Sequence, residues 1–147
     1  EENLLTKDSI ENRLPEKINI IRNGEDVLFI CCGSILEETI IAIDILSSDC
    51  KAGLINIHSL KPLDIDSILG QICSYKFVVT VEEHSVIGGL GSAIAEIIAQ
   101  SSFNVQQLMI GVPDTITTQI GKRDYLLEQH NMDPKSISNR VKSFILS

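Results

Sequence analysis

The fold is decided by the run Val78-Val79-Thr80-Val81-Glu82-Glu83-His84-Ser85-Val86-Ile87-Gly88-Gly89-Leu90-Gly91-Ser92-Ala93-Ile94-Ala95-Glu96. It passes from an apolar, β-branched segment through two acids and a histidine into a glycine-rich turn, which opens an amphipathic helix. This order predicts a strand, a loop and a helix start. In open α/β sheets such loops lie at the carboxyl edge of the strands, where these folds place ligands or partner surfaces.

Expected strands and expected helices alternate on either side of this run. Apolar runs that predict inner strands and periodic runs that predict helices follow one another; the strands are expected at 27–32, 52–57, 77–81 and 105–110, and the helices at 37–47, 65–72, 91–101, 123–130 and 134–146. Asp64 and Asp133 are the expected N-caps of two of these helices. Because right-handed crossovers join successive strands, the alternation predicts an α/β fold with a mostly parallel open sheet of about five strands and helices on both faces.

The first strand is expected to run against the others. Ile18 to Ile21 is a short apolar run, and Asn23-Gly24 behind it is a strong hairpin signal. We therefore predict that this strand is antiparallel and pairs with Val27–Cys32.

Length and composition fit one domain with a single core. The chain has 147 residues, of which 44% are hydrophobic and 4% aromatic, so its interior must be built from aliphatic side chains. Residues 1–17 are polar and aperiodic, and we interpret them as a linker or the trailing segment of a preceding domain. The domain itself is expected to cover residues 18–147.

Charge and hydropathy exclude several classes of partner. The formal net charge of -8 would repel nucleic acid. No apolar run approaches the length of about 20 residues that a bilayer requires, and Glu1-Glu2-Asn3 lacks the basic region of a signal peptide. The expected location is the cytoplasm. Free cysteines agree with that expectation, because Cys31, Cys32, Cys50 and Cys73 form neither a CxxC pair nor a zinc pattern.

The glycine turn resembles a dinucleotide fingerprint only in part. Gly89-Leu90-Gly91 begins a GxG, but Ile94 stands where the last glycine belongs, and Glu82 and Glu83 would repel a pyrophosphate. The favoured interpretation is that Gly88, Gly89 and Gly91 allow positive φ or close approach to a neighbouring backbone.

Glu82, Glu83 and His84 are the candidates for acid/base chemistry, because imidazole titrates near neutral pH. Neighbouring strand residues point to opposite sides, so at most one of the two acids can share a cleft with His84. No serine, cysteine or metal set elsewhere completes a triad with them. Capping or an interface role is the favoured interpretation of this trio.

Three motifs in order resemble the carboxy-terminal domain of transketolases. They are Thr80 to Ala93, the upstream Leu60-Lys61-Pro62-Leu63-Asp64 and the downstream Ile110-Gly111-Val112-Pro113-Asp114. The resemblance covers roughly residues 18 to 146 and implies that family's three-layer fold. After Asp114 the sequence departs from the family pattern, which leaves the subgroup open.

The resemblance implies a thiamine diphosphate and magnesium dependent transfer of a two-carbon ketol unit between sugar phosphates. In that family the diphosphate-binding and pyrimidine-binding domains hold the cofactors, and the third domain packs against them and helps a homodimer to assemble. We therefore expect no catalytic, cofactor-binding or metal-binding residue in this chain. Glu82, Glu83, His84, Gly88, Gly89 and Gly91 form the expected interface loop.

Three alternatives stay open at this level. The chain could belong to deoxyxylulose phosphate synthase or to a 2-oxo acid dehydrogenase β subunit, since both share the third domain. It could also be a free-standing module that binds an anion or nucleotide at the Gly88 to Gly91 turn.

Overall fold

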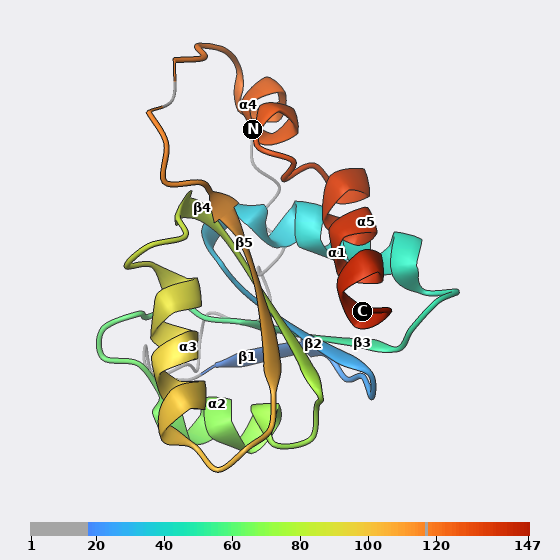
Figure 1. Ribbon diagram of the computed structural model, residues 1–147, viewed down its shortest axis with the longest axis vertical. Coiled ribbons are helices and arrows are strands. Elements are labelled where there is room, and N and C mark those ends of the chain that lie inside the picture. The colour runs from blue at the N-terminus through green and yellow to red at the C-terminus, as the bar shows by residue number, and fades with distance from the viewer. Residues whose placement is uncertain (1–17, 117) are drawn as a thin grey trace, which may run out of the picture.

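The computed structural model describes residues 18–116 and 118–147. The expected linker, 1–17, therefore lies outside the described residues. Within these two ranges the elements follow in the order β1 (Asn19–Arg22), β2 (Val27–Cys32), a 3₁₀ turn (Gly33–Ile35), α1 (Leu36–Leu46), β3 (Ala52–Asn56), α2 (Ile65–Ile72), β4 (Phe77–Ser85), α3 (Leu90–Gln100), β5 (Gln106–Val112), α4 (Arg123–Gln129) and α5 (Pro134–Ile145). The expected strand and helix alternation is confirmed (Figure 1).

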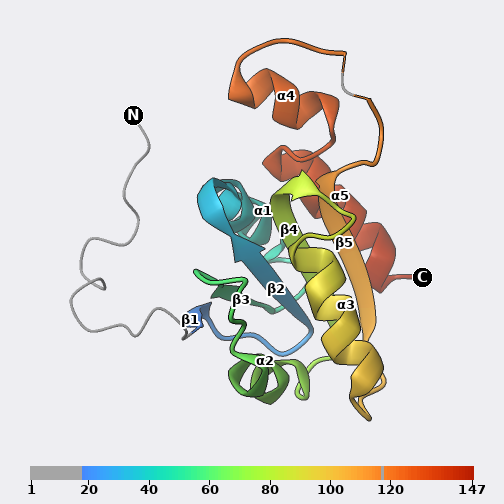
Figure 2. The same ribbon diagram turned by 90° about the vertical axis from the view of Figure 1, so that its left-hand side faces the viewer.

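The five strands form one sheet in the order β1-β3-β2-β4-β5. Strands β2, β3, β4 and β5 are parallel, and β1 is antiparallel to its neighbour β3. Helices α1 and α5 lie on one face of the sheet and α2 and α3 on the other (Figures 1 and 2). The predicted three-layer α/β fold, with an antiparallel first strand, is thus confirmed.

The predicted pairing of the first strand was wrong. β1 pairs with β3 and not with β2, because Asn23-Gly24 does not close a hairpin. Instead the chain passes the amino end of β3, where the backbone N–H groups of Glu25 and Asp26 donate to the carbonyl of Lys51 at 2.9 and 3.0 Å. All of β3 is buried, so it requires a partner on both edges, and β1 supplies the outer one.

Two aliphatic clusters hold the layers together. One contains Phe29, Leu54 and Val79 with residues of α1 and α5, and the other contains Leu28, Ile55 and Val78 with residues of α2 and α3. The alternation of strand side chains between faces explains this division. It also separates the adjacent thiols, since Cys31 belongs to the first cluster and Cys32 to the second.

Both predicted helix caps are confirmed. The Asp64 carboxylate accepts from the N–H of Ser67 at 3.1 Å, and the Asp133 carboxylate accepts from that of Ser136 at 3.1 Å. Pro134 occupies the first turn of α5, where its missing N–H costs nothing.

The four cysteines are free, as expected. Burial raises the pKa of Cys31, and burial followed by the charge of Glu82 raises the pKa of Cys32 to about 11. Cys73 is exposed, and Cys50 is half-buried.

Candidate functional site

Strand β4 extends further than the sequence predicted. The expected end was Val81, but the strand continues to Ser85 and so contains Glu82, Glu83 and His84. Its register with β5 shifts between Val81 and Ser85, and the N–H of Val86 still donates to the carbonyl of Val112 at 3.0 Å. The two acids therefore stand on strand backbone beside the glycine turn.

Glu82 closes the amino end of α3. Its side chain is 1% exposed, and its two carboxylate oxygens accept from the N–H of Leu90 at 2.7 Å and from that of Gly91 at 2.8 Å. A helix N-terminus carries unpaired N–H groups and about half a positive charge. A carboxylate there is therefore stabilised both by hydrogen bonds and by the helix dipole. The chain thus supplies its own anion at the place where a nucleotide fold would hold a phosphate.

Two glycines make this closure possible. Gly88 has a φ of +78°, which L side chains rarely adopt. A Cβ on Gly89 would lie 2.1 Å from the Oε2 atom of Glu82, so only glycine lets the carboxylate reach the helix. The expectation of positive φ and close approach is confirmed at these positions.

Further side chains hold the turn from both ends. Ser92 accepts from the N–H of Gly88 at 2.8 Å and donates to the carbonyl of Val86 at 3.1 Å. From β5, the amide of Gln107 donates to the carbonyl of Gly91 at 2.9 Å. The Gly88 to Gly91 turn is therefore fixed by hydrogen bonds to β5 and to its own helix.

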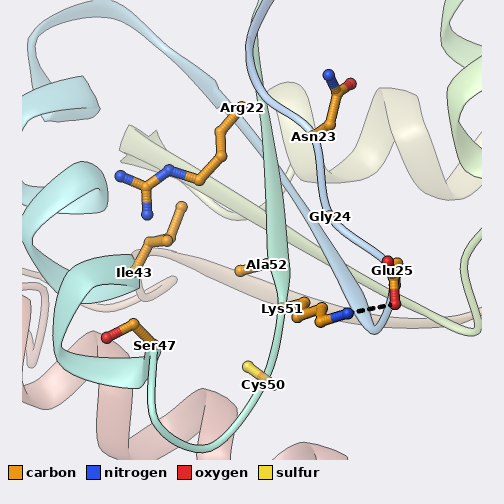
Figure 3. Close-up of a pocket in the computed structure, with 9 residues that line it drawn as sticks. All are labelled: Arg22, Asn23, Gly24, Glu25, Ile43, Ser47, Cys50, Lys51 and Ala52. Carbon is orange, nitrogen blue, oxygen red and sulfur yellow. Dashed lines mark hydrogen bonds and ion pairs between the residues drawn. The ribbon is translucent and has the colours of Figure 1, made fainter.

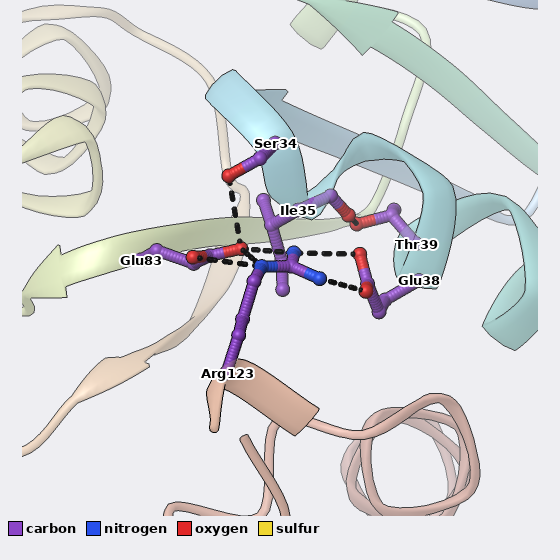
Figure 4. A network of polar contacts seen from close by, with 6 residues as sticks. All are labelled: Ser34, Ile35, Glu38, Thr39, Glu83 and Arg123. Atoms are coloured by element: carbon purple, nitrogen blue, oxygen red, sulfur yellow. Dashed lines mark hydrogen bonds and ion pairs between the residues drawn. The ribbon is translucent and has the colours of Figure 1, made fainter. Parts of the chain in front are cut away.

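Glu83 points the other way, into an ionic network (Figure 4). The guanidinium of Arg123, at the start of α4, pairs with Glu83 and with Glu38 of α1, and its Nε donates to an oxygen of Glu83 at 3.0 Å. The hydroxyl of Ser34 donates to the same oxygen at 3.1 Å. Hydrogen bonds from Arg123, first to Glu38 and then to Glu83, raise the pKa of the guanidinium above its ordinary value.

This network fixes α4 over the carboxyl end of the sheet. One arginine balances one of two carboxylates, so the cluster keeps one formal negative charge. Sequence reasoning missed Arg123, Glu38 and Ser34, because the hydrogen-bonded pairs of the network are 40 to 85 positions apart along the chain and no local pattern joins them. His84 is exposed, and among the described residues no hydrogen bond or ion pair joins its side chain to Glu82 or Glu83.

A hollow lies at the opposite, amino end of the strands. It has a volume of about 330 Å³ and is formed by the Asn23-Gly24 connection, the end of α1 and the start of β3 (Figure 3). Its charged groups are engaged, since Lys51 pairs with Glu25 at 2.9 Å and Arg22 with Asp44 at 2.8 Å. It offers a ligand no unpaired charge.

The fold and the carboxyl edge of the sheet define an open α/β domain whose glycine turn is closed by a carboxylate of the chain itself. Residues 16–137 match the family described as transketolase, C-terminal domain. Because the match spans most of the sequence, the chain belongs to the transketolase C-terminal domain family.

Similar proteins agree with this assignment. The chain is 39% identical over 126 residues to a protein of Methanocaldococcus jannaschii named as a transketolase C-terminal section, covering 85% of this chain and 39% of that protein. It is 32% identical to 1-deoxy-D-xylulose-5-phosphate synthase of Syntrophotalea carbinolica, covering 94% of this chain and 22% of the synthase. It is 28% identical to a protein of Actinobacillus succinogenes named as one subunit of apulose-4-phosphate transketolase, covering 84% of this chain and 40% of that protein. The chain thus spans two fifths or less of these relatives.

Solved structures give the same answer. A split-gene transketolase, described as an inactive beta4 tetramer, superposes with a TM-score of 0.82 at 27% identity, covering 91% of this chain and 44% of that one. A transketolase of Pichia stipitis has a TM-score of 0.67 at 15% identity, covering 88% of this chain and 18% of that one, which supports the fold alone.

The cofactors that the family implies do not fit the described residues. A hard divalent cation needs several oxygen ligands, and residues 18–116 and 118–147 contain no group of three or more His, Cys, Asp or Glu arranged to hold one. The N-terminus of α3, which could receive a diphosphate, is filled by Glu82.

None of the helices in the same two ranges has the length and apolar character needed to span a bilayer.

Proposed function

We propose that this chain serves as the C-terminal domain of a thiamine diphosphate and magnesium dependent transferase that moves a two-carbon ketol unit between sugar phosphates. Its role is to pack against the pyrimidine-binding and diphosphate-binding domains and to help a homodimer assemble in the cytoplasm. The chain alone does not catalyse. The family membership and the short share of each relative that it spans support this proposal.

The closure of the glycine turn by Glu82 carries the proposal. The N–H groups of Leu90 and Gly91 are already taken by a buried carboxylate, which would also repel a phosphate, and this argues against the anion-binding module at Gly88 to Gly91. Around this closure lie Glu82, Glu83, His84, Gly88, Gly89 and Gly91, a rim that we keep as the interface loop.

Exposed apolar side chains near this rim support a packing role. Ile87 in the loop is 65% exposed, and Ile116 and Ile120, beyond β5, are 93% and 96% exposed. Aliphatic side chains this exposed supply apolar surface for another domain to cover. Segment 113–116 leaves the sheet at this carboxyl edge.

The test is an activity assay with and without the missing portion. The purified chain is mixed with thiamine diphosphate, Mg²⁺ and sugar phosphates, alone and together with the pyrimidine-binding and diphosphate-binding domains. We expect turnover only in the combined sample. A control without thiamine diphosphate excludes contaminating activity, and cofactor-dependent turnover by the lone chain would refute the proposal.

A second candidate is a deoxyxylulose phosphate synthase, favoured by several relatives of that name at 29 to 33% identity. The combined sample distinguishes the two when one portion also receives pyruvate and glyceraldehyde 3-phosphate, which condense with loss of CO2 in the synthase reaction, and another receives only a ketose phosphate donor and an aldose phosphate acceptor. Formation of 1-deoxy-D-xylulose 5-phosphate would favour the synthase, and ketol transfer without that product would favour the transketolase.

A further inference from the structure

A second cavity lies beside the free edge of the sheet. It has a volume of about 610 Å³, and its floor is formed by the last part of β5 and by Val86. Its polar wall comes from the turn after α4, with His130 and Asn131, and from one side of α5, with Ser136, Asn139 and Arg140. Positions 136, 139 and 140 are three and four residues apart, so α5 presents these side chains together.

Arg140 has an unusual environment for a cation in this acidic chain. In the described ranges it is the one half-buried lysine or arginine that pairs with no carboxylate, whereas Arg22 and Arg123 are both in ion pairs. Its Nη2 donates to the carbonyl of Met109 at 3.3 Å, which leaves the other guanidinium N–H groups to be satisfied. Burial without a compensating anion lowers the pKa of this guanidinium.

The rest of the wall matches this positive charge. None of the side chains that line the cavity is a carboxylate, although the formal net charge of the whole chain is -8. Two amides, one hydroxyl and one imidazole surround the arginine, and each can donate a hydrogen bond. The nearby Asp133 is engaged at the N-terminus of α5, where it accepts from Ser136.

We propose that this cavity binds a small phosphate monoester. The planar guanidinium of Arg140 would hold two phosphate oxygens side by side, as arginine does with phosphate elsewhere. The cavity falls within the range of about 300–1,000 Å³ that small-molecule sites occupy, and it exceeds what a bare phosphate fills. Asn131 and Asn139 are suited to the hydroxyl groups of the esterified portion. This site is separate from the closed turn at α3 and does not depend on catalysis.

The test is calorimetry of the full chain with ribose 5-phosphate, ribose and inorganic phosphate, combined with NMR to locate the shifts. We expect ribose 5-phosphate to bind most tightly and to shift the backbone signals of residues 130–140. Arg140→Gln should weaken its binding about tenfold or more, because a hydrogen-bonded charge is lost. Arg22→Gln makes the same charge change outside the cavity and should leave the affinity within about twofold.

A second variant keeps the test decisive if Arg140→Gln folds poorly. Asn139→Asp changes an exposed side chain of the same shape into an anion, and it should also weaken binding by about tenfold or more. Four results would overturn the proposal: no binding at millimolar ribose 5-phosphate, equal affinity for ribose, equal affinity for inorganic phosphate, or equal weakening by Arg22→Gln and Arg140→Gln.

Discussion

Glu82→Ala is expected to lower the free energy of unfolding by about 3 kcal/mol. The substitution leaves the N–H groups of Leu90 and Gly91 without their acceptor in a buried place, and each unsatisfied donor costs about 1–3 kcal/mol. Water entering the vacated space offsets part of this cost. Glu82→Gln keeps one acceptor oxygen and should lose an intermediate amount. Urea unfolding followed by circular dichroism measures all three proteins.

Glu96→Ala is the matched control for Glu82→Ala. It removes the same side chain from the exposed surface of α3, so we expect a change within about 0.5 kcal/mol. If Glu82→Ala also changed the unfolding free energy by no more than that, the carboxylate would not organise the turn as described.

Gly24→Ala is expected to destabilise the chain by about 3 kcal/mol, at the upper end of the cost of overpacking. A Cβ at this position would lie 2.1 Å from the nitrogen of Gly53 and 2.3 Å from the carbonyl carbon of Ala52. These are backbone atoms of β3, so relief requires moving a central strand. The hydroxyl of Tyr75 donates to the carbonyl of Gly24 at 2.9 Å, which further restricts any shift.

Gly70→Ala should have the opposite sign. Gly70 lies inside α2 with open space where a Cβ would stand, so alanine should stabilise by about 0.5–1 kcal/mol through the lower backbone entropy of the unfolded chain. Thermal and urea unfolding of the two variants give the comparison. Equal effects at Gly24 and Gly70 would contradict the close crossing of the chain over the start of β3.

The Gly24 crossing also explains why the first pairing could not be predicted. Asn23-Gly24 between two apolar runs favours a two-residue hairpin on local grounds. The observed choice depends on β3, some 30 residues further on, which is buried along its whole length and takes β1 at its outer edge. The burial of β3, a distant strand, therefore overrides the local preference of Asn23-Gly24 for a hairpin.

Other features were predictable because their causes are local. Asp64 and Asp133 cap helices through N–H groups three residues ahead, and the apolar periodicity of α2 and α5 marks the faces that they bury. The close packing expected of Gly88 and Gly89 was also visible, since glycine at a strand-to-helix turn indicates positive φ or close approach.

The candidate site likewise has a part that the sequence predicted and a part that it did not. Glu82 and Glu83 were recognised as a pair with opposite directions, but their partners were not. The Glu82 carboxylate accepts from N–H groups eight and nine residues later, at the start of α3. This contact depends on β4 extending beyond Val81, so that Glu82 lies on strand backbone. Arg123 pairs with Glu83 and Glu38 because α4 begins beside the carboxyl end of β4 and the start of α1, and an isolated arginine in a sequence does not indicate such a position.

Hydrogen exchange of the Glu82 to Gly91 segment tests the central claim most directly. The amides of residues 82–91 are followed in the isolated chain and in its complex with the pyrimidine-binding and diphosphate-binding domains. Because Ile87 and Gly88 are exposed and their N–H groups bond only to serine hydroxyls, their exchange should slow markedly when a partner covers the loop. Unchanged exchange in this loop, with new protection confined to α1 and α5, would contradict the account.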